Sequence, residues 1–259
     1  IAPGSMLMGM DIKAAFPLID LHPSQWTYMG FRWWDPDSGE LVTYVSTQFP
    51  FGGSWCPAIF TKIIGHVAQL IRNRGIPTIS YLDDFLFIFS KKDMEEGLWR
   101  HVLPPFRKAG FAIHLGKSSV APVPELEHQG FLVNGMEGTF SIPPRKIAKV
   151  SATLESFVKL GVGATHQARD VASLAGKLLN FGLVFGRIAR TQIMDFFFLL
   201  ASRSGLDKGR MSSPEKWIRD KAAKDSWRGT VASTPQVIAA CTWWLKALRS
   251  PPTAQTTAL

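Results

Sequence analysis

The chain has 259 residues, of which 46% are hydrophobic and 19% are charged, and this balance excludes wholesale disorder. Lys and Arg outnumber Asp and Glu by 29 to 20, so the net charge of +9 favours polyanionic partners such as nucleic acid. Two distant cysteines, Cys56 and Cys241, exclude a disulfide framework and a zinc pattern, and no apolar run is long enough to span a membrane. We therefore expect an intracellular protein of the cytoplasm or nucleus.

The first elements that the pattern predicts are strands and one helix. Residues 6–12 form an apolar run ending in an acid, which predicts a buried strand with Asp11 at its end. Two runs rich in aromatic and β-branched residues, Thr27–Trp34 and Leu41–Gln48, flank a turn-forming cluster and predict a hairpin. Apolar residues at helical spacing predict a helix over Ile59–Arg74.

The middle of the chain contains the sharpest pattern. Residues 77–90 place two adjacent acids, Asp83 and Asp84, between apolar β-forming runs, which predicts two strands joined by a two-residue turn at the acids. Met94–Ala109 is predicted to be a helix that Pro104 and Pro105 kink or split. Further short strands are predicted over three segments: Phe111–Leu115, Glu127–Val133 and Thr139–Ile142.

After Pro143-Pro144 the periodicity becomes helical. It predicts helices over Arg145–Leu160, Ala168–Phe185 and Arg187–Ser202, followed by a polar loop over 203–216. Val237–Leu248 is predicted as a last short helix, and Ser250–Leu259 as a disordered tail.

The candidate catalytic residues are three carboxylates, Asp11, Asp83 and Asp84. Asp11 and Asp83 are separated by 83 − 11 = 72 residues, and each lies at the end of an apolar strand. A buried charge there is costly unless it is paired or binds a cation, and adjacent carboxylates repel each other. Hard oxygen ligands suit Mg²⁺ or Mn²⁺, and two ions about 3.5–4 Å apart catalyse in-line phosphoryl transfer. The alternative is that Asp83 and Asp84 form a plain hairpin turn.

Five segments, in order along the chain, resemble the conserved motifs of reverse transcriptases from LTR-type or tyrosine-recombinase (DIRS-type) retrotransposons. They are Met10–Phe16 with Leu21-His22-Pro23 (motif A), Gln48–Gly52 with Pro57 and Phe60 (B), Tyr81–Asp84 (C), Phe106–Lys117 with Lys117-Ser118 (D) and His128–Leu132 (E). The motif B segment departs from the common retroviral pattern, because Phe51 rather than Gln precedes the glycine.

The resemblance implies an α+β fold with three parts. Residues 1–142 would form the palm, an antiparallel sheet packed on helices that carries motifs A to E, with the fingers mostly absent. Residues 143–202 would form a helical thumb-like region. Residues 203–259 would hold the loop, the short helix and the disordered tail.

The resemblance also assigns roles in catalysis. Asp11 and Asp83 would bind two Mg²⁺ ions, Asp84 would be a weaker ligand, and the carbonyl of Ile12 would complete the coordination of the second ion. Lys117 would help to protonate the pyrophosphate, although it is equally consistent with a solvated surface lysine.

Further residues would hold the substrates. Phe16 would be a steric gate that excludes a ribose 2′-hydroxyl, although a Phe is also a common core residue. The nucleotide would be lined by Gln48, Pro50, Gly52 and Tyr81, and the primer end by Gly130 and Phe131. His114 and His128 are interpreted as structural or surface residues. The basic thumb residues are candidate phosphate contacts or solvated helix faces: Lys146, Lys149, Lys159, Arg169, Lys177, Arg187 and Arg190.

The resemblance predicts an RNA-directed DNA polymerase that adds dNTPs to a primer 3′-hydroxyl. Its partners would be an RNA template and a DNA or RNA primer, and no membrane binding is expected. The parent polyprotein would carry ribonuclease H, integrase or recombinase domains. One alternative is a catalytically inactive or domesticated polymerase fold that binds nucleic acid. Another is an RNA-templated RNA polymerase, against which Phe16 argues through its clash with the 2′-hydroxyl.

Overall fold

The computed structural model describes residues 1–90, 97–119, 121–203 and 229–256. The chain divides into two compact units. Of the described residues, the first unit contains those within 1–128 and 133–138, and the second contains those within 129–132 and 139–256. Residues 94–96 of one predicted helix and residues 204–216 of the predicted loop lie outside the described residues.

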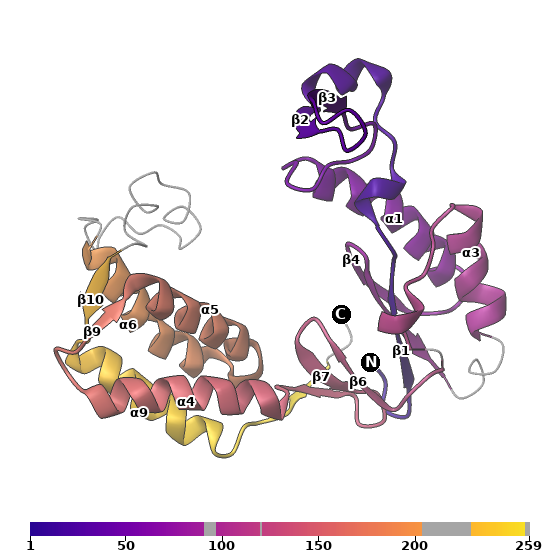
Figure 1. The fold of residues 1–259 in the computed structure, drawn as a ribbon. Helices are drawn as coiled ribbons and strands as arrows, with labels where there is room; N and C mark the ends of the chain where they lie inside the picture. The colour runs from indigo at the N-terminus through magenta and orange to yellow at the C-terminus, as the bar shows by residue number, and fades with distance from the viewer. Residues whose placement is uncertain (91–96, 120, 204–228, 257–259) are drawn as a thin grey trace. The chain divides into compact units, whose positions relative to one another are not determined.

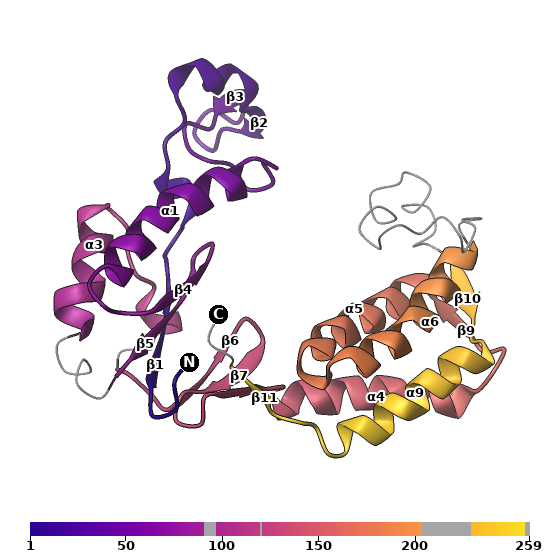
Figure 2. The same cartoon turned by 180° about the vertical axis from the view of Figure 1, so that it is seen from behind.

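The first unit is built on a three-stranded antiparallel sheet of order β1-β5-β4 (Figures 1 and 2). Its strands are β1 (Met6–Asp11), β5 (Asp84–Phe89) and β4 (Thr78–Tyr81). Side chains alternate between the two faces of a strand, so Met8 and Met10 share one face with Phe85 and Phe87. All four side chains are buried, which fixes the register and therefore the face to which every other strand residue belongs.

Two helices cover this apolar face. Helix α1 (Cys56–Arg72) contributes Phe60 and Ile64 to the core, and α3 (Leu103–Lys108) contributes Phe106, whose ring meets Phe85 edge-on at 5.0 Å. A π-helical segment, η4 (Gly97–Val102), precedes α3. Pro104 and Pro105 lie in the first turn of α3, where a proline costs no hydrogen bond, so the predicted helix breaks just before them.

The predicted hairpin forms from β2 (Gly30–Trp34) and β3 (Leu41–Val45), which pair in antiparallel register. It follows two 3₁₀ segments, η1 (Phe16–Leu18) and η2 (Pro23–Tyr28). Large apolar side chains are exposed on both faces of the hairpin, including Phe31 and Val42 on one face and Trp34 and Val45 on the other.

A second sheet has the order β11-β8-β7-β6. Its strands are β6 (Glu125–His128), β7 (Phe131–Asn134), β8 (Thr139–Ser141) and β11 (Ala254–Gln255). The prediction of one strand over Glu127–Val133 is wrong, because Gln129 and Gly130 both adopt positive φ, 48° and 83°, and turn the chain into a hairpin.

Two other predictions need correction. The segment 250–256 is not a disordered tail, because β11 pairs with the edge of β8 and so satisfies its backbone groups. Phe111–Leu115 is not a strand. Ile113 makes only an isolated bridge to Ile12, and Gly110 and the 3₁₀ turn η5 (Leu115–Lys117) bend the chain on either side.

The second unit is mainly helical. Figures 1 and 2 show α4 (Pro144–Leu160), α5 (Ala168–Phe185), α6 (Arg187–Arg203) and α9 (Pro235–Leu248) packed together, with the short strands β9 (Thr165–Gln167) and β10 (Thr230–Ala232) paired at one end. All four helices were predicted from periodicity, and the β9–β10 pair was not. Trp244 is fully buried in this core.

The ring of His166, on β9, stacks face to face on Phe157 of α4 at 3.8 Å. Burial lowers the pKa of this imidazole from 6.5, against a smaller opposing effect of Asp170. The folded chain therefore binds fewer protons here than the unfolded chain, and stability that is present above pH 6.5 is lost as the pH falls below it. We expect His166→Gln to flatten the fall in the free energy of unfolding between pH 7 and pH 5 (about the range in which His titrates) in urea titrations. An unchanged slope would contradict this assignment.

No helix in the described ranges is both long enough and apolar enough to cross a membrane.

Candidate active site

Asp11 and Asp84 face each other across neighbouring strands. Asp11 is the last residue of β1 and Asp84 the first of β5, and the antiparallel register pairs them directly. Because alternate residues Met10 and Ile12 enter the helical core, both acids lie on the opposite face of the sheet. The same face carries Gly9, where an added Cβ would contact Ser119 and Leu126, so these two side chains lie over it.

Asp83 lies in the turn beside this pair. Tyr81 pairs with Asp84, so the two turn residues are Leu82 and Asp83 rather than the two acids that the sequence predicted. The peptide N–H of Ile12 donates to the carbonyl of Asp83 at 2.9 Å, which fixes the turn against the end of β1. Leu82 has a φ of 54°, a left-handed conformation that costs a non-glycine residue about 1 kcal/mol or more.

The carboxyl group of Asp11 sits in a field of mixed charges. Burial raises its pKa, the charge of Lys117 opposes that rise, and Asp83 and Asp84 both add to it. Lys117 Nζ lies 4.0 Å from Asp11 Oδ2 while its side chain is 65% exposed. The three carboxyl groups are therefore close enough to interact, and a cation placed among them would be strongly favoured.

Two residues that sequence reasoning missed hold the backbone of Asp11. Its peptide N–H donates to Ser118 Oγ at 3.0 Å, and the Ser118 hydroxyl donates to the carbonyl of His114 at 2.9 Å. The peptide N–H of His114 in turn donates to the carbonyl of Asp11 at 2.8 Å. In the sequence, only its position next to Lys117 draws attention to Ser118.

His128, at the end of β6, contacts Asp84. Its Nδ1 lies 3.4 Å from Asp84 Oδ1, and the side chain is only 7% exposed. Its Nε2 is buried and has no hydrogen-bond partner among the described residues. The sequence interpretation of His128 as a structural or surface residue did not include this contact, because nothing in the local pattern places β6 beside β1.

The three acids offer the type of donor atom that Mg²⁺ requires. Carboxylate oxygens are the donors that a hard divalent cation prefers, and Asp11, Asp83 and Asp84 bring them together. As the side chains stand, no cluster of three or more His, Cys, Asp or Glu in the described part of the chain is arranged to hold an ion.

Phe16 and Tyr81 lie in the same unit as the acids. The Phe16 ring packs edge-on against Phe60 at 5.3 Å and Phe51 at 5.9 Å, so it is partly buried and held from two sides. Tyr81, on β4, is 61% exposed and pairs with Asp84 across the strands. Phe85, Phe87 and Phe89 are fully buried, as expected for sheet packing.

The motif B residues form a bend before α1. Gln48 bridges to Asp20 in the backbone, and Pro50 lies near Gly53, where an added Cβ would come within 3.6 Å of its ring. Gly52 has a φ of 92°, a conformation that favours glycine.

Gly130 and Phe131 belong to the second unit. Gly130 accepts a hydrogen bond from Lys146 Nζ at 2.9 Å through its carbonyl, and Phe131 packs edge-on against Phe140 at 5.6 Å.

The family model described as "Reverse transcriptase (RNA-dependent DNA polymerase)" matches residues 2–134. The chain belongs to the reverse transcriptase family. Among its relatives, the Gag-Pol polyprotein of koala retrovirus is 27% identical over 129 residues, which are 49% of this chain and 8% of that polyprotein. The Gag-Pol polyprotein of gibbon ape leukemia virus is 26% identical over 171 residues, 64% of this chain and 10% of that protein. This reverse transcriptase chain thus spans about a tenth or less of these relatives.

Solved structures support the fold of this reverse transcriptase. A foamy viral protease-reverse transcriptase in complex with double-stranded DNA covers the whole chain, with a TM-score of 0.67, 16% identity and 37% of its own length matched. The foamy viral protein in complex with an RNA/DNA hybrid covers 95% of this chain at a TM-score of 0.65 and 17% identity, over 27% of its own length. The α+β prediction is confirmed, as is the predicted family; the subtype, LTR or DIRS, stays a prediction.

Proposed function

We propose that the chain is the palm and thumb portion of an RNA-directed DNA polymerase, which adds dNTPs to a primer 3′-hydroxyl. The observation that carries this proposal is the pairing of Asp11 with Asp84 across β1 and β5, with Asp83 in the adjoining turn. Acids brought together from two distant segments at the ends of apolar strands are an unusual and costly arrangement that a polymerase needs.

The metal site would use Asp11, Asp83 and Asp84, with the carbonyl of Ile12 as a further ligand. Two bound Mg²⁺ ions, or Mn²⁺, would supply the charge that activates the 3′-hydroxyl and neutralises the departing pyrophosphate. Ser118 and His114 hold the Asp11 backbone in place, and the Asp83 turn is hydrogen-bonded to Ile12. These contacts support a site whose ligands are positioned before substrate arrives.

Other side chains would position the substrates. Lys117, whose ammonium group lies beside Asp11, would donate a proton to the pyrophosphate. Phe16 would close the nucleotide pocket against a 2′-hydroxyl, and Gln48, Pro50, Gly52 and Tyr81 would line the nucleotide. Gly130 and Phe131 would hold the primer end.

The partners would be an RNA template and its primer. The foamy viral proteins of similar fold are described in complex with double-stranded DNA and with an RNA/DNA hybrid, and the polyprotein relatives support a parent that carries further domains. Those domains would be ribonuclease H, integrase or recombinase domains. Cys56 and Cys241 are both free thiols, which fits a reducing intracellular location.

Primer extension on an RNA template tests the proposal. We expect the parent protein that contains this chain to extend a DNA primer with dNTPs in Mg²⁺, and to stop when the metal is chelated. Salt-dependent binding of template–primer without any incorporation would instead support the alternative of an inactive polymerase fold.

Sugar selection gives a second prediction. Phe16→Ala removes a ring that Phe51 and Phe60 hold in place, so we expect the preference for dNTPs over rNTPs to fall by about tenfold to a hundredfold. Single-nucleotide incorporation with each sugar measures this ratio. Phe31→Ala, at an exposed position of β2, is the control and should leave the ratio unchanged. An unaltered ratio in Phe16→Ala would assign that ring to the core.

A further inference from the structure

The strand β6 packs near β1, on the face of the sheet that carries the acids. Leu126 of β6 lies over Gly9, where an added Cβ would come within 3.9 Å of its Cδ2 atom. Gly9 and Asp11 share one face of β1 because they are two residues apart, and Asp11 pairs with Asp84. Leu126 and His128 are likewise two residues apart, so they point to the same side of β6. The strands therefore bring His128 to the end of the sheet where the acids lie.

The imidazole of His128 is buried against the carboxylate of Asp84. Its Nδ1 lies 3.4 Å from Oδ1 of Asp84, and only 7% of the His128 side chain is exposed. The Nε2 atom is buried and has no hydrogen-bond partner among the residues that the structure describes. An ionised carboxylate only accepts hydrogen bonds, so the ring proton is best placed on Nδ1, where an acceptor stands. A small rotation of either side chain then shortens the contact to hydrogen-bond length.

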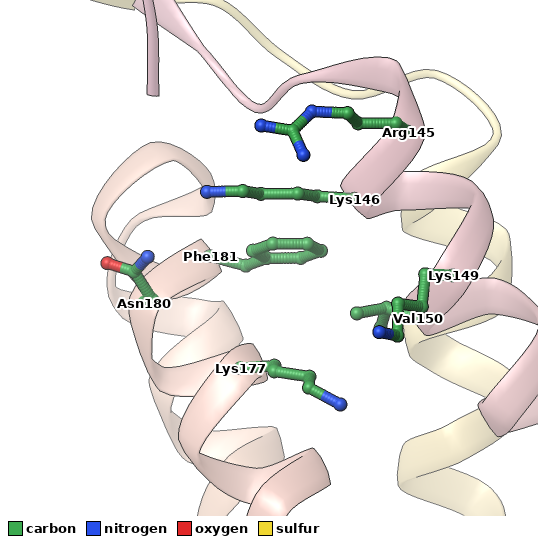
Figure 3. Close-up of a pocket in the computed structure, with 7 residues that line it drawn as sticks. All are labelled: Arg145, Lys146, Lys149, Val150, Lys177, Asn180 and Phe181. Carbon is green, nitrogen blue, oxygen red and sulfur yellow. The ribbon is translucent and has the colours of Figure 1, made fainter. Parts of the chain in front are cut away.

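The contact of His128 with Asp84 is internal to the first unit. Gly130, two residues further along the chain, belongs to the second unit. There its carbonyl accepts a hydrogen bond from Lys146 Nζ at 2.9 Å, and Figure 3 shows this lysine extending from α4 over the ring of Phe181. The turn between β6 and β7 is therefore held by a separate contact, and a variant at Lys146 loosens the turn without altering the imidazole.

An imidazole on one oxygen limits what a carboxylate can offer to a cation. Carboxylates bind cations either through one oxygen or through both. With Oδ1 engaged by His128, Asp84 cannot close on an ion with both oxygens. Ca²⁺ accepts such two-oxygen ligands in flexible shells, whereas Mg²⁺ is smaller, demands near-octahedral geometry and keeps several waters. A one-oxygen carboxylate therefore suits Mg²⁺, and Mn²⁺ with its similar choice of donors, better than Ca²⁺.

We propose that His128 is a positioning residue of the metal site, which holds Oδ1 of Asp84 so that this carboxylate serves as a one-oxygen ligand and the site prefers Mg²⁺ and Mn²⁺ to Ca²⁺. This inference rests on the proposed function, because the ion is one that Asp11 and Asp83 would also bind. It goes further by assigning the ion preference to a residue that is not itself a ligand. Removal of such an outer partner commonly changes metal affinity by about tenfold to a hundredfold.

Ion binding without nucleotides tests this proposal. Binding of Mn²⁺ to the parent protein would be followed by the loss of the electron paramagnetic resonance signal of free Mn²⁺, and Mg²⁺ or Ca²⁺ would then be added to displace it. Subtracting the binding that remains in Asp83→Asn isolates the ions held by the acids. We expect His128→Phe, which fills the site with an apolar ring, to bind Mn²⁺ about tenfold more weakly. The ratio of Mg²⁺ to Ca²⁺ affinity should fall severalfold in the same variant.

A conservative variant separates positioning from packing. Asn places an amide nitrogen at the same distance along the side chain as Nδ1 of His, so His128→Asn can still donate to Asp84. It fills less space, so we expect a lower thermal unfolding midpoint together with the wild-type ion preference. Two controls should keep both the Mn²⁺ affinity and the ion preference. They are His66→Phe, the same exchange at an exposed position of α1, and Lys146→Met, which releases the β6–β7 turn.

The outcomes distinguish this inference from the proposed function. Wild-type ion preference in His128→Phe, with Mn²⁺ binding lost in Asp83→Asn, would overturn the role of His128 and leave the proposed function standing. Loss of the ion preference in His128→Asn would also overturn it, as would an equal loss in Lys146→Met, which would assign the effect to the turn. If Asp83→Asn binds as much Mn²⁺ as the wild type, the acids do not hold the ion and both proposals fail.

Discussion

Replacing Asp83 by Asn is expected to reduce nucleotide incorporation by about a thousandfold or more, on the scale of losing a preorganised electrostatic contact to the transition state. Asn keeps the shape of the side chain and tolerates turn positions, so the Leu82-Asp83 turn should persist. It removes the charge that, with Asp11 and Asp84, would bind the metals. Single-turnover extension of a primer on an RNA template, with the parent protein, measures the effect.

Two observations separate this loss from misfolding. Asp37→Asn, at an exposed position between β2 and β3, removes an equal charge away from the site and should retain full incorporation. The variant at Asp83 should keep the wild-type thermal unfolding midpoint and the wild-type affinity for template–primer. Undiminished incorporation in Asp83→Asn would remove that residue from the metal site.

Replacing Trp244 by Ala is expected to lower the free energy of unfolding of the second unit by about 3–5 kcal/mol. Trp244 is fully buried in α9, where its ring meets Phe185 edge-on at 5.3 Å and Trp243 at 5.2 Å. Truncation to a methyl group leaves a large cavity in the hydrophobic core to which Trp244 belongs. Urea denaturation followed by circular dichroism at the helix band measures the change.

The matched control is Trp33→Ala on β2, because that indole is 66% exposed. It loses the same atoms but leaves no buried cavity, so we expect a change well under 1 kcal/mol, as for most surface substitutions. If both variants unfold at the same urea concentration, Trp244 does not carry the core of the second unit.

The sequence predicted elements whose signal is local. The helix α5 begins and ends at the predicted residues, Ala168 and Phe185, because its apolar stripe is continuous and Gly186 follows it. The strands β9, β10 and β11 were missed because each is two or three residues long, and only pairing with a distant segment makes it a strand. The turn at Leu82 was misplaced since nothing local predicts a leucine at positive φ.

The same distinction between local and distant signals applies to the residues of the candidate site. The segments carrying Asp11 and Asp83 could be found from sequence, because a charge at the end of an apolar strand is a local anomaly. The residues that support them could not be found. Ser118 contacts Asp11 across a separation of 107 residues in the chain. His128 contacts Asp84 only because the fold brings β6 close to it. The roles of Lys117 and Phe16 stay predictions.

The order in which the chain is synthesised bears on the pairing of β1 with β5. Between Asp11 and its partner Asp84 lie the 3₁₀ segments, a hairpin, α1 and β4, so this contact has a high sequence separation. Contacts of that kind form late and slow the folding rate, whereas the hairpin β4–β5 closes locally. During synthesis we therefore expect β1 to remain unpaired, with its apolar side chains exposed, until β5 leaves the ribosome. Exposed methionines of this kind are expected to bind chaperones during that interval.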